Sequence, residues 1–564
     1  MAAPLRDDVA VYAVTGLATA TLSIAVVHAV ATILRAAFGG HPEPIPAWQL
    51  TSWSLFLGAM ALLLCATRRR GSLARFLPAL VALSGCLVVA RSSPVAAMSL
   101  FATWIGQVAA CSLVAARLST AFKGKTRIGT TALVAWVALA LVMLVQVARL
   151  TTYMADPTVD WWLTTRDELW ARHMCMPAYV EAADLQRRNV PNVYDAAHYP
   201  ALVRDAKPSL TVDHIEMFVG DPFQYPPPFL LAPLAALRLT NDFLVMRTVW
   251  YVVQLLGMVG VALLLSAWVG GTEGRRAAWL LPLLIVSIPA MQALQYGQFH
   301  LAALLLGVSA MIAFERGRPV TGGALLAATI LSKIFPGILL ILLVAQKRWR
   351  EAAWTTAFIG LFTALAVLVL GPAPFHTFVS YQLPRLANGQ AFAFADQWPE
   401  LRLPIVVIGN LSPTGLLAKL QELGVARLSE VAGGLMRRAY DLLLIGLVLW
   451  GARRPRSRRE TAAVWLALLN LGALEGYAAW GDYVTVGTVW LLTLFADERR
   501  GSRFTLALLG TAWVLCALVP GVQPIPSPLP VVVALVLTSA ITIAVVVTNT
   551  WAIVHASSTS PGSS

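Results

Sequence analysis

Long apolar stretches dominate this chain and restrict it to a membrane fold. A helix that spans a bilayer needs about 20 apolar residues, and the sequence contains about sixteen apolar stretches that are candidate spans, several of them short. They include residues 9–37, the fifth stretch 130–150, and residues 240–269 and 277–294. Only 12% of its 564 residues are charged, about half of the roughly 25% that is typical of a soluble domain. So few charges cannot solvate a soluble protein of this length. The pattern excludes an array of soluble domains or a disordered chain, and it predicts an all-α polytopic membrane protein.

The excess of positive charge indicates orientation in a membrane and no nucleic-acid partner. Lys and Arg number 42 and Asp and Glu number 28, so the formal net charge is +14. Short cytoplasmic loops of membrane proteins are enriched in Lys and Arg. More than half of the basic residues fall in seven short loops, and the densest cluster lies in residues 453–459. All seven loops share one side if the N-terminus is cytoplasmic, which is the orientation we predict.

Two long polar loops, residues 151–239 and 372–435, interrupt the apolar pattern and fall on the opposite, outer face. Loops of this length are usually functional or disordered, and the first is too rich in Trp and Tyr to be disordered. Its residues 176–188 have apolar positions at helical spacing, which predicts an amphipathic helix on the membrane surface. Residues 226–238 are apolar, Pro-rich and too short to span, which predicts a re-entrant or interfacial helix.

Three acids that follow the fifth apolar stretch are the first candidates for chemistry. They are Asp156, Asp160 and Asp167. Each could be a solvated loop charge, and Asp167 could cap a helix N-terminus. A carboxylate on the outer face could instead act as a general base, removing a proton from an acceptor hydroxyl while a sugar is displaced from a lipid phosphate.

A series of short motifs resembles glycosyltransferase family 87. The motifs occur in the expected order, and the resemblance covers about residues 131–500. They are Tyr179-x-x-Ala182-Ala183, Val193-Tyr194-Asp195, Phe223-Gln224-Tyr225-Pro226-Pro227, Tyr296-Gly297-Gln298, Arg316-Gly317-Arg318, Lys333-Ile334-Phe335-Pro336 and Trp480-Gly481-Asp482-Tyr483.

Members of this family are membrane enzymes of the GT-C fold, and the best understood are polyprenyl-phosphate-mannose-dependent mannosyltransferases of bacterial envelopes. The resemblance implies a GT-C-type helical bundle in a bacterial plasma membrane, with membrane lipid around it. It also implies inverting transfer of a hexose, most plausibly mannose, from a polyprenyl-phosphate donor to a glycolipid or glycan acceptor on the outer face. A catalytic Asp is expected in the first outer loop. The lipid-linked sugar is the donor, so we expect no cofactor, and the spacing of the cysteines indicates no metal site.

The sequence departs from the family pattern at two places. Cys175 and the residue before it stand where family members carry an Asp, and Asp482 stands where a His is common. We rank Asp167 first as the base, because Asp-Glu followed by a short helix also resembles the acidic motif of other GT-C enzymes. Asp160 is second and Asp156 third.

Other polar residues are candidates for donor or acceptor binding. Lys333 lies between two short apolar halves, where an ionisable group indicates a functional site and could pair with the donor phosphate. Snorkelling of Lys333 to an interface is the alternative. Gln298 and His300 open a helix, where they could cap it or contact sugar hydroxyls. The remaining candidates are Tyr225, Asp482, Tyr483, Arg385 and Arg402.

The chain is expected to have four parts. Residues 1–125 form an N-terminal membrane module of about four spans without an assigned function, and residues 126–500 form the glycosyltransferase core. C-terminal transmembrane helices follow in 501–553, and 554–564 have the composition of a disordered tail. Two other functions stay open. An O-antigen ligase or polymerase would need Arg and His in the later loop, and a flippase for lipid-linked glycans would show inverted repeats.

Overall fold

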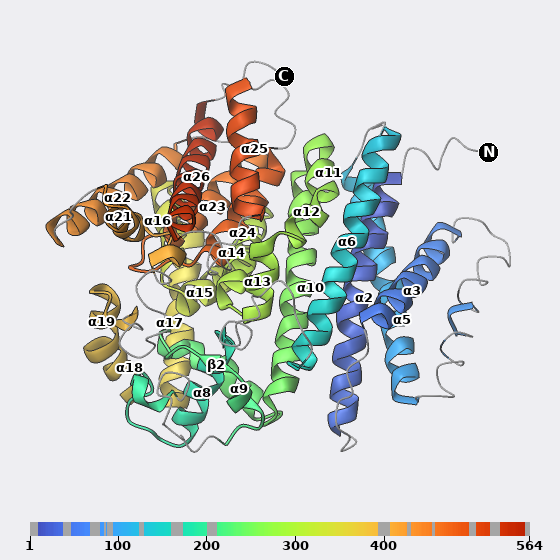
Figure 1. The fold of residues 1–564 in the computed structure, drawn as a ribbon, viewed down its shortest axis with the longest axis horizontal. Coiled ribbons are helices and arrows are strands. Elements are labelled where there is room, and N and C mark those ends of the chain that lie inside the picture. Colours follow the sequence, from blue (N-terminus) through green and yellow to red (C-terminus); the bar gives the residue numbers. More distant parts are fainter. Residues whose placement is uncertain are drawn as a thin grey trace. The chain divides into compact units, whose positions relative to one another are not determined.

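The structure is a computed structural model, and its described part is almost entirely helical (Figure 1). The only strands among the described residues are two of two residues each. The all-α membrane fold predicted from the apolar stretches is therefore confirmed. The described residues are 9–37, 47–67, 79, 81–83, 86, 94–122, 129–158, 173–199, 211–392, 407–425, 430–453, 457–495, 503–518 and 531–558.

The chain forms two compact units. The first comprises Met1–Trp161 and Asp242–Val286, and the second comprises Trp162–Asn241 and Ser287–Ser564. The four parts expected from the sequence stay a prediction.

In the first unit, helix α2 packs against α3, α5, α6 and α10. Hydroxyl groups on α2 bond back to carbonyls one turn earlier, as Thr19 does to Thr15 and Ser23 to Thr19. Such bonds satisfy polar side chains without water. The helices of this unit are α2 (Val9–Ala37), α3 (Ala47–Thr67), α5 (Pro94–Ala121), α6 (Thr130–Ala155), α10 (Phe243–Val269), α11 (Gly271–Trp279) and α12 (Leu281–Ile285).

A buried arginine joins α10 to the end of α6. The guanidinium of Arg247 is fully buried and donates hydrogen bonds to the carbonyls of Tyr153 (2.9 Å) and Met154 (3.0 Å). Carbonyls at the end of a helix have no intrahelical partner and carry partial negative charge. Arg247 therefore compensates the end of α6, which stops at Ala155, one residue before Asp156.

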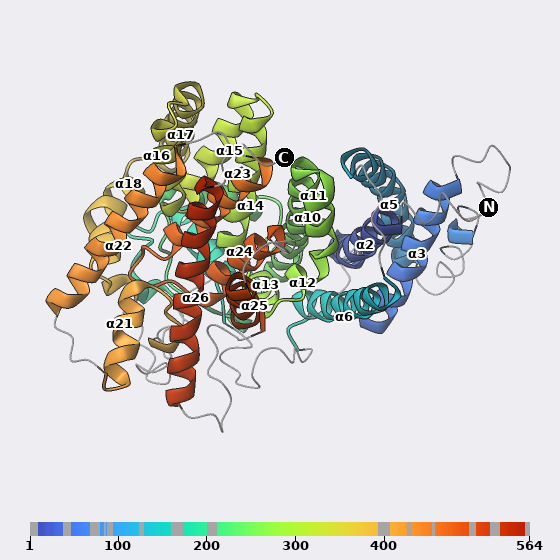
Figure 2. The ribbon, with the colours of Figure 1, turned by 90° about the horizontal axis from the view of Figure 1, so that it is seen from above.

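The second unit contains the other helices and both strands. Its C-terminal helix α26 packs against α22, α23, α24 and α25 (Figure 2). The elements are β1 (His173–Met174), α8 (Met176–Arg187), η2 (Ala196–His198), η3 (Ile215–Met217), β2 (Val219–Gly220), η4 (Pro227–Leu230), α9 (Leu231–Leu237), α13 (Ile288–Tyr296), α14 (Phe299–Glu315), α15 (Pro319–Ser332), η5 (Phe335–Gly337), α16 (Ile338–Ala345), α17 (Trp349–Leu370), α18 (Ala373–Thr377), η6 (Phe378–Gln382), α19 (Leu383–Ala387), η7 (Gln390–Phe392), α21 (Pro413–Glu422), α22 (Glu430–Gly451), α23 (Arg458–Ala473), α24 (Gly481–Leu494), α25 (Arg503–Leu518) and α26 (Val531–Ser558).

Amide side chains connect three of these helices across an apolar interface. Asn470 of α23 donates to the side-chain oxygen of Asn549 of α26 (2.9 Å), and Asn549 donates to the hydroxyl of Thr488 of α24 (3.0 Å). Asn470, Asn549 and Thr488 are all buried. Interhelical hydrogen bonds of this kind, together with close packing, hold helices together where lipid removes the hydrophobic driving force.

Fewer helices than expected are long enough to cross a bilayer alone. Five described helices qualify by length and composition, and a sixth if the bent pair α13 and α14 counts as one span. The stretch predicted as one span, residues 277–294, is divided among α11, α12 and α13. The expectation of about sixteen spans is therefore not met by full-length helices in the described part of the chain. The five are Ala10–Ile33, Thr130–Ala155, Phe243–Val269, Trp349–Leu370 and Val531–His555.

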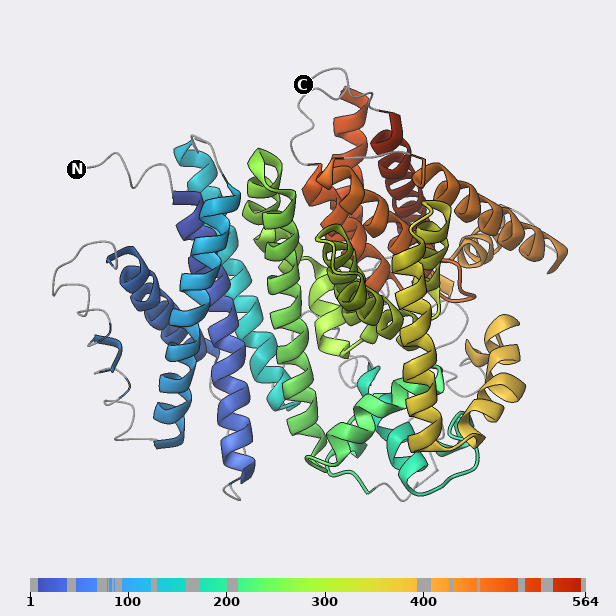
Figure 3. The same ribbon diagram turned by 180° about the vertical axis from the view of Figure 1, so that it is seen from behind.

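The first polar loop contains the two predicted short helices. Residues 226–238 form η4 and α9, and α17, yellow in Figure 3, extends to this end of the unit and packs on η4. Whether they enter a membrane stays a prediction. The other helix, α8, lies where it was expected, but it does not expose one polar face as an amphipathic surface helix would. Every residue from Met176 to Leu185 is buried, including Glu181 and Asp184, because neighbouring segments cover both faces.

Close packing of α15 on α17 depends on Gly323. A Cβ atom at this position would lie 2.8 Å from the Cβ of Trp354 and 2.9 Å from the backbone nitrogen of Thr355. We expect Gly323→Ala to destabilise the protein by about 1–3 kcal/mol through overpacking, measured as a lower thermal midpoint in detergent. Gly360→Ala is the matched control, because a Cβ at Gly360 of α17 meets no atom within 4 Å. Equal midpoints for the two variants would contradict this packing.

Candidate active site

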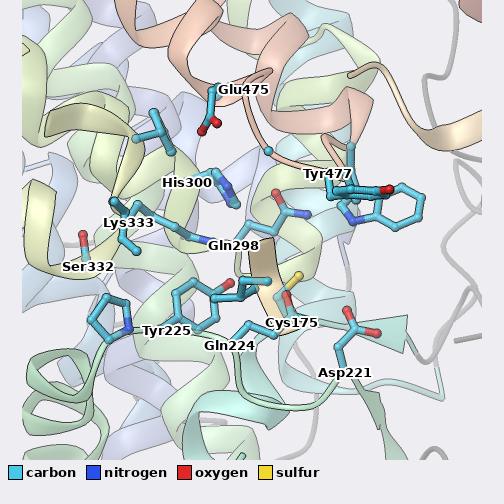
Figure 4. A pocket seen from close by; sticks show the side chains of 18 of the residues that line it. Cys175, Asp221, Gln224, Tyr225, Gln298, His300, Ser332, Lys333, Glu475 and Tyr477 are labelled. Carbon is cyan, nitrogen blue, oxygen red and sulfur yellow. The ribbon is translucent and has the colours of Figure 1, made fainter. Parts of the chain in front are cut away.

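A cavity of about 360 Å³ lies within the second unit (Figure 4). Small-molecule sites commonly measure roughly 300–1,000 Å³. Two helix breaks, the end of β2, one face of α8 and the segment after α23 all contribute to its wall. Its polar and aromatic lining includes Cys175, Tyr179, Asp221, Gln224, Tyr225, Gln298, His300, Ser332, Lys333, Arg437, Glu475, Tyr477 and Trp480.

The two helix breaks bring polar residues to the cavity. Helices α13 and α14 meet at 109°, and Gly297 between them has φ +63°, in the left-handed region that favours glycine. Gln298 stands before the first residue of α14, and its side chain does not cap the helix. At the second break, α15 ends at Ser332 and Lys333 has an extended backbone (φ −146°, ψ 124°). Irregular backbone is tolerated at membrane depth where it lines a cavity.

Two tyrosines form one wall of the cavity and position the lysine. The hydroxyls of Tyr179 and Tyr225 lie 2.9 Å apart, and the backbone N–H of Phe299 donates to the Tyr179 hydroxyl (3.2 Å). The hydroxyl of Tyr194 donates to the Tyr225 carbonyl (3.1 Å). Burial raises the pKa of Tyr179 and of Tyr225 well above the usual value, so both phenols stay neutral. The Lys333 Nζ lies 3.8 Å from the centroid of the Tyr225 ring, a cation–π contact.

The short parallel ladder of β1 and β2 places two residues beside each other. His173 pairs with Val219, and Met174 pairs with Gly220. Cys175 and Asp221 directly follow the two strands, and both line the cavity. The backbone N–H of Cys175 also donates to the carbonyl of Tyr296 at the end of α13 (3.0 Å), which ties this ladder to the first helix break.

A different part of the cavity wall carries an ion pair. Arg437 of α22 donates to Glu475 (3.2 Å) and to the carbonyl of Ala387 at the end of α19 (2.8 Å). The segment after Glu475 is held by Asn410, whose side-chain nitrogen donates to the carbonyl of Tyr477 (3.0 Å). These bonds connect the second polar loop to the helices that surround the cavity.

The two polar loops also meet directly. The side chain of Gln224 in the first loop donates to the carbonyl of Ala391 in the second (2.9 Å). Gly389 has φ +83°, and a Cβ there would lie 2.5 Å from the Tyr477 ring, so only glycine permits this approach. The predicted outer loops therefore join in the wall of one cavity.

Four of the residues proposed from the sequence line this cavity: Lys333, Gln298, His300 and Tyr225. Arg385 lies instead against the Tyr381 ring, 4.9 Å from its centroid. The remaining proposed residues are placed as follows. Asp156 lies in the first unit, where it accepts hydrogen bonds from the Thr158 N–H and hydroxyl. Asp160, Asp167 and Arg402 lie outside the described residues. Asp482 and Tyr483 belong to α24, and their side chains lie outside the described part of the chain.

Several residues that line the cavity, among them Asp221 and Arg437, have no role predicted from the sequence. Asp221 could have been noticed, because it stands two residues before the Phe223-Gln224-Tyr225 motif. Arg437 had no signal, because its role depends on a carboxylate far away in the sequence. Within the described part of the chain, no group of three or more His, Cys, Asp or Glu residues is arranged to hold a metal ion.

Comparison with protein families agrees with the motifs. Residues 223–475 match the model of glycosyltransferase family 87. Over residues 223–475 the chain belongs to this family. It is therefore a membrane glycosyltransferase, and membership favours this activity over the flippase alternative. No curated protein and no solved structure matches the chain significantly.

The matched region includes most of the cavity lining. It begins at Phe223 in the Tyr225 motif and ends at Glu475, and it contains both helix breaks. Helix α8 and the β1 strand precede it, yet Cys175 and Tyr179 line the same cavity. The cavity is thus assembled from the matched region and the segments directly before and after it.

The buried Glu181 on α8 predicts a pH-dependent stability. Burial and the nearby Asp184 raise its pKa from 4.5 to about 8. The folded state therefore holds an extra proton between these values, and its contribution to stability falls as the pH rises through them. We expect Glu181→Gln to raise the thermal midpoint relative to the unmodified protein increasingly from about pH 5 to about pH 8. The exposed Glu216→Gln is the control, and a difference independent of pH at Glu181 would contradict the assignment.

Proposed function

We propose that the cavity is the site where this glycosyltransferase moves a hexose, mannose first, from a polyprenyl-phosphate donor to a glycolipid or glycan acceptor. The reaction takes place on the outer face of a bacterial plasma membrane, with the N-terminus in the cytoplasm. The observation that carries the proposal is the position of Lys333, an ammonium at a helix break beside a polar and aromatic cavity.

Lys333 is suited to the phosphate of the donor. A cation within an apolar bundle is a functional-site candidate, because its burial is costly unless an anion or a polar cavity compensates it. Its contact with the Tyr225 ring holds the ammonium at the cavity wall. Charge-assisted hydrogen bonds to a phosphate are about twice as strong as neutral ones.

The rest of the lining is suited to a sugar. Gln224, Gln298 and Ser332 supply hydrogen-bonding groups for hydroxyls, and Tyr477 and Trp480 supply aromatic surface for the apolar face of a sugar ring. Of the four residues predicted for substrate contact that reach this cavity, three come from three separate motifs, and His300 follows one of these motifs by two residues. Their convergence supports a single binding site for the donor sugar and its phosphate.

The proposed chemistry is a single displacement with inversion. An acceptor hydroxyl attacks the anomeric carbon, a carboxylate removes its proton, and the lipid phosphate leaves with the electrons of the broken bond. Lys333 stabilises the charge that develops on the phosphate. No cofactor takes part in this scheme. Asp167, Asp160 and Asp156 remain the predictions that the sequence makes for the base.

Replacement of Lys333 tests the site. We expect Lys333→Met to lower transfer and donor affinity about 10- to 100-fold, because a hydrogen bond to a charged group contributes roughly 1.5–3 kcal/mol. Lys333→Arg should retain part of both. The measurement is hexose transfer in vesicles from prenyl-phosphate mannose, glucose and galactose, with donor concentration varied. Arg385→Met removes a cation from the second polar loop at a position that does not line the cavity. If Lys333→Met transfers as well as Arg385→Met, the cavity is not the donor site.

A further inference from the structure

We propose that Asp221 is the general base of the transfer and acts on the acceptor hydroxyl at the side of the cavity away from Lys333. This inference rests on the proposed function and names the group that carries out its proton transfer. It adds a fourth carboxylate to the three acids suggested by the sequence, and this one lines the cavity.

The backbone around Asp221 fixes its position. The residue before it pairs with β1 in the parallel ladder, and Pro222 and Phe223 after it are buried, Phe223 completely. Two residues after Phe223, the carbonyl of Tyr225 accepts a hydrogen bond from the hydroxyl of Tyr194 (3.1 Å). A base must be held within hydrogen-bonding reach of the proton it removes. Because the backbone is anchored on both sides of Asp221, its carboxylate is held in place at the cavity.

The other described carboxylate in the cavity lining has a different role. Glu475 accepts a hydrogen bond from Arg437 (3.2 Å), and the same guanidinium holds the carbonyl of Ala387. If Glu475 took up a proton, it would weaken this ion pair and the attachment of the second polar loop. Glu475 therefore acts in positioning, and Asp221 is the described carboxylate of the lining that we assign to proton transfer.

The arrangement of charges matches a displacement with inversion. Figure 4 shows Lys333 on one side of the view and Asp221 on the other, with Tyr225 and Gln298 between them. Inversion requires the attacking and leaving oxygens to lie on opposite faces of the anomeric carbon. A sugar over Tyr225 and Gln298, with its phosphate toward Lys333, presents its free face to an acceptor beside Asp221.

The step is balanced without another reactant. The acceptor oxygen forms a bond to the anomeric carbon while its proton passes to the Asp221 carboxylate. The bond from the anomeric carbon to the phosphate oxygen breaks, and its electron pair leaves with the prenyl phosphate. The proton on Asp221 then passes to solvent, which restores the carboxylate for the next cycle.

Asp221→Asn tests this role in the full-length protein in vesicles. The donors are the three prenyl-phosphate hexoses, and octyl hexosides serve as probe acceptors. We expect transfer to the hydroxyl acceptor to fall about 100- to 10,000-fold, the range for loss of a general base, while the donor Kd changes less than about twofold. Asp221→Glu should retain more transfer than the Asn variant. Asp213→Asn, an exposed acid of the same loop, should transfer like the unmodified protein.

Azide distinguishes a base from a merely structural residue, because it attacks the anomeric carbon without losing a proton. We expect Asp221→Asn to form the glycosyl azide at close to the rate of the unmodified protein. Parallel loss of glycosyl azide, hydroxyl transfer and donor binding would show a structural role and overturn the inference. Retention of hydroxyl transfer within about threefold would also overturn it.

The same assay separates this inference from the proposed function. If Asn at 156, 160 or 167 abolishes hydroxyl transfer with donor binding intact, while Asp221→Asn stays active, the base is elsewhere and the proposed function stands. If the unmodified protein uses none of the prenyl-phosphate hexoses, the proposed donor is wrong, and the inference falls with it.

Discussion

The need to satisfy backbone hydrogen bonds without water governs this structure. In lipid a helix can end or break only where other groups meet its freed N–H and C=O groups or where it lines a cavity. The breaks at Gly297 and Lys333 follow this rule, and both line the same cavity. The carbonyl of Tyr296 at the first break accepts the N–H of Cys175 from a distant segment. The constraint on the backbone thus produces the site, because polar residues gather where the helices are interrupted.

The same requirement explains two sets of buried polar groups away from the cavity. Arg247 binds the last carbonyls of α6, and the Asn470–Asn549–Thr488 chain joins three helices. Each group finds its partner in protein, since lipid offers none. These contacts support the framework, whereas Lys333, Asp221 and the amides of the cavity face a space that can hold a substrate. The distinction separates structural polar residues from candidate functional ones.

Local patterns predicted some features and failed at others. Apolar length predicted α2, α6 and α10 closely, because a long run of helix-forming apolar residues has few alternatives in lipid. The exposed polar face predicted for α8 was wrong, because helical spacing in residues 176–188 reports which side chains share a face but not what covers them. The division of residues 277–294 was also missed, since short helices and long ones look alike in an apolar stretch.

The sequence alone determined the membrane fold and the resemblance to family 87, and it singled out Lys333, Gln298, His300 and Tyr225, which line the cavity. Composition, apolar length and motif order carry that information, because each is a local property of the chain. Only the tertiary structure brought Asp221 beside Cys175 and joined Arg437 to Glu475. These pairs are formed by segments separated by about 40 residues. Their contacts depend on how strands and helices pack, which no local pattern encodes.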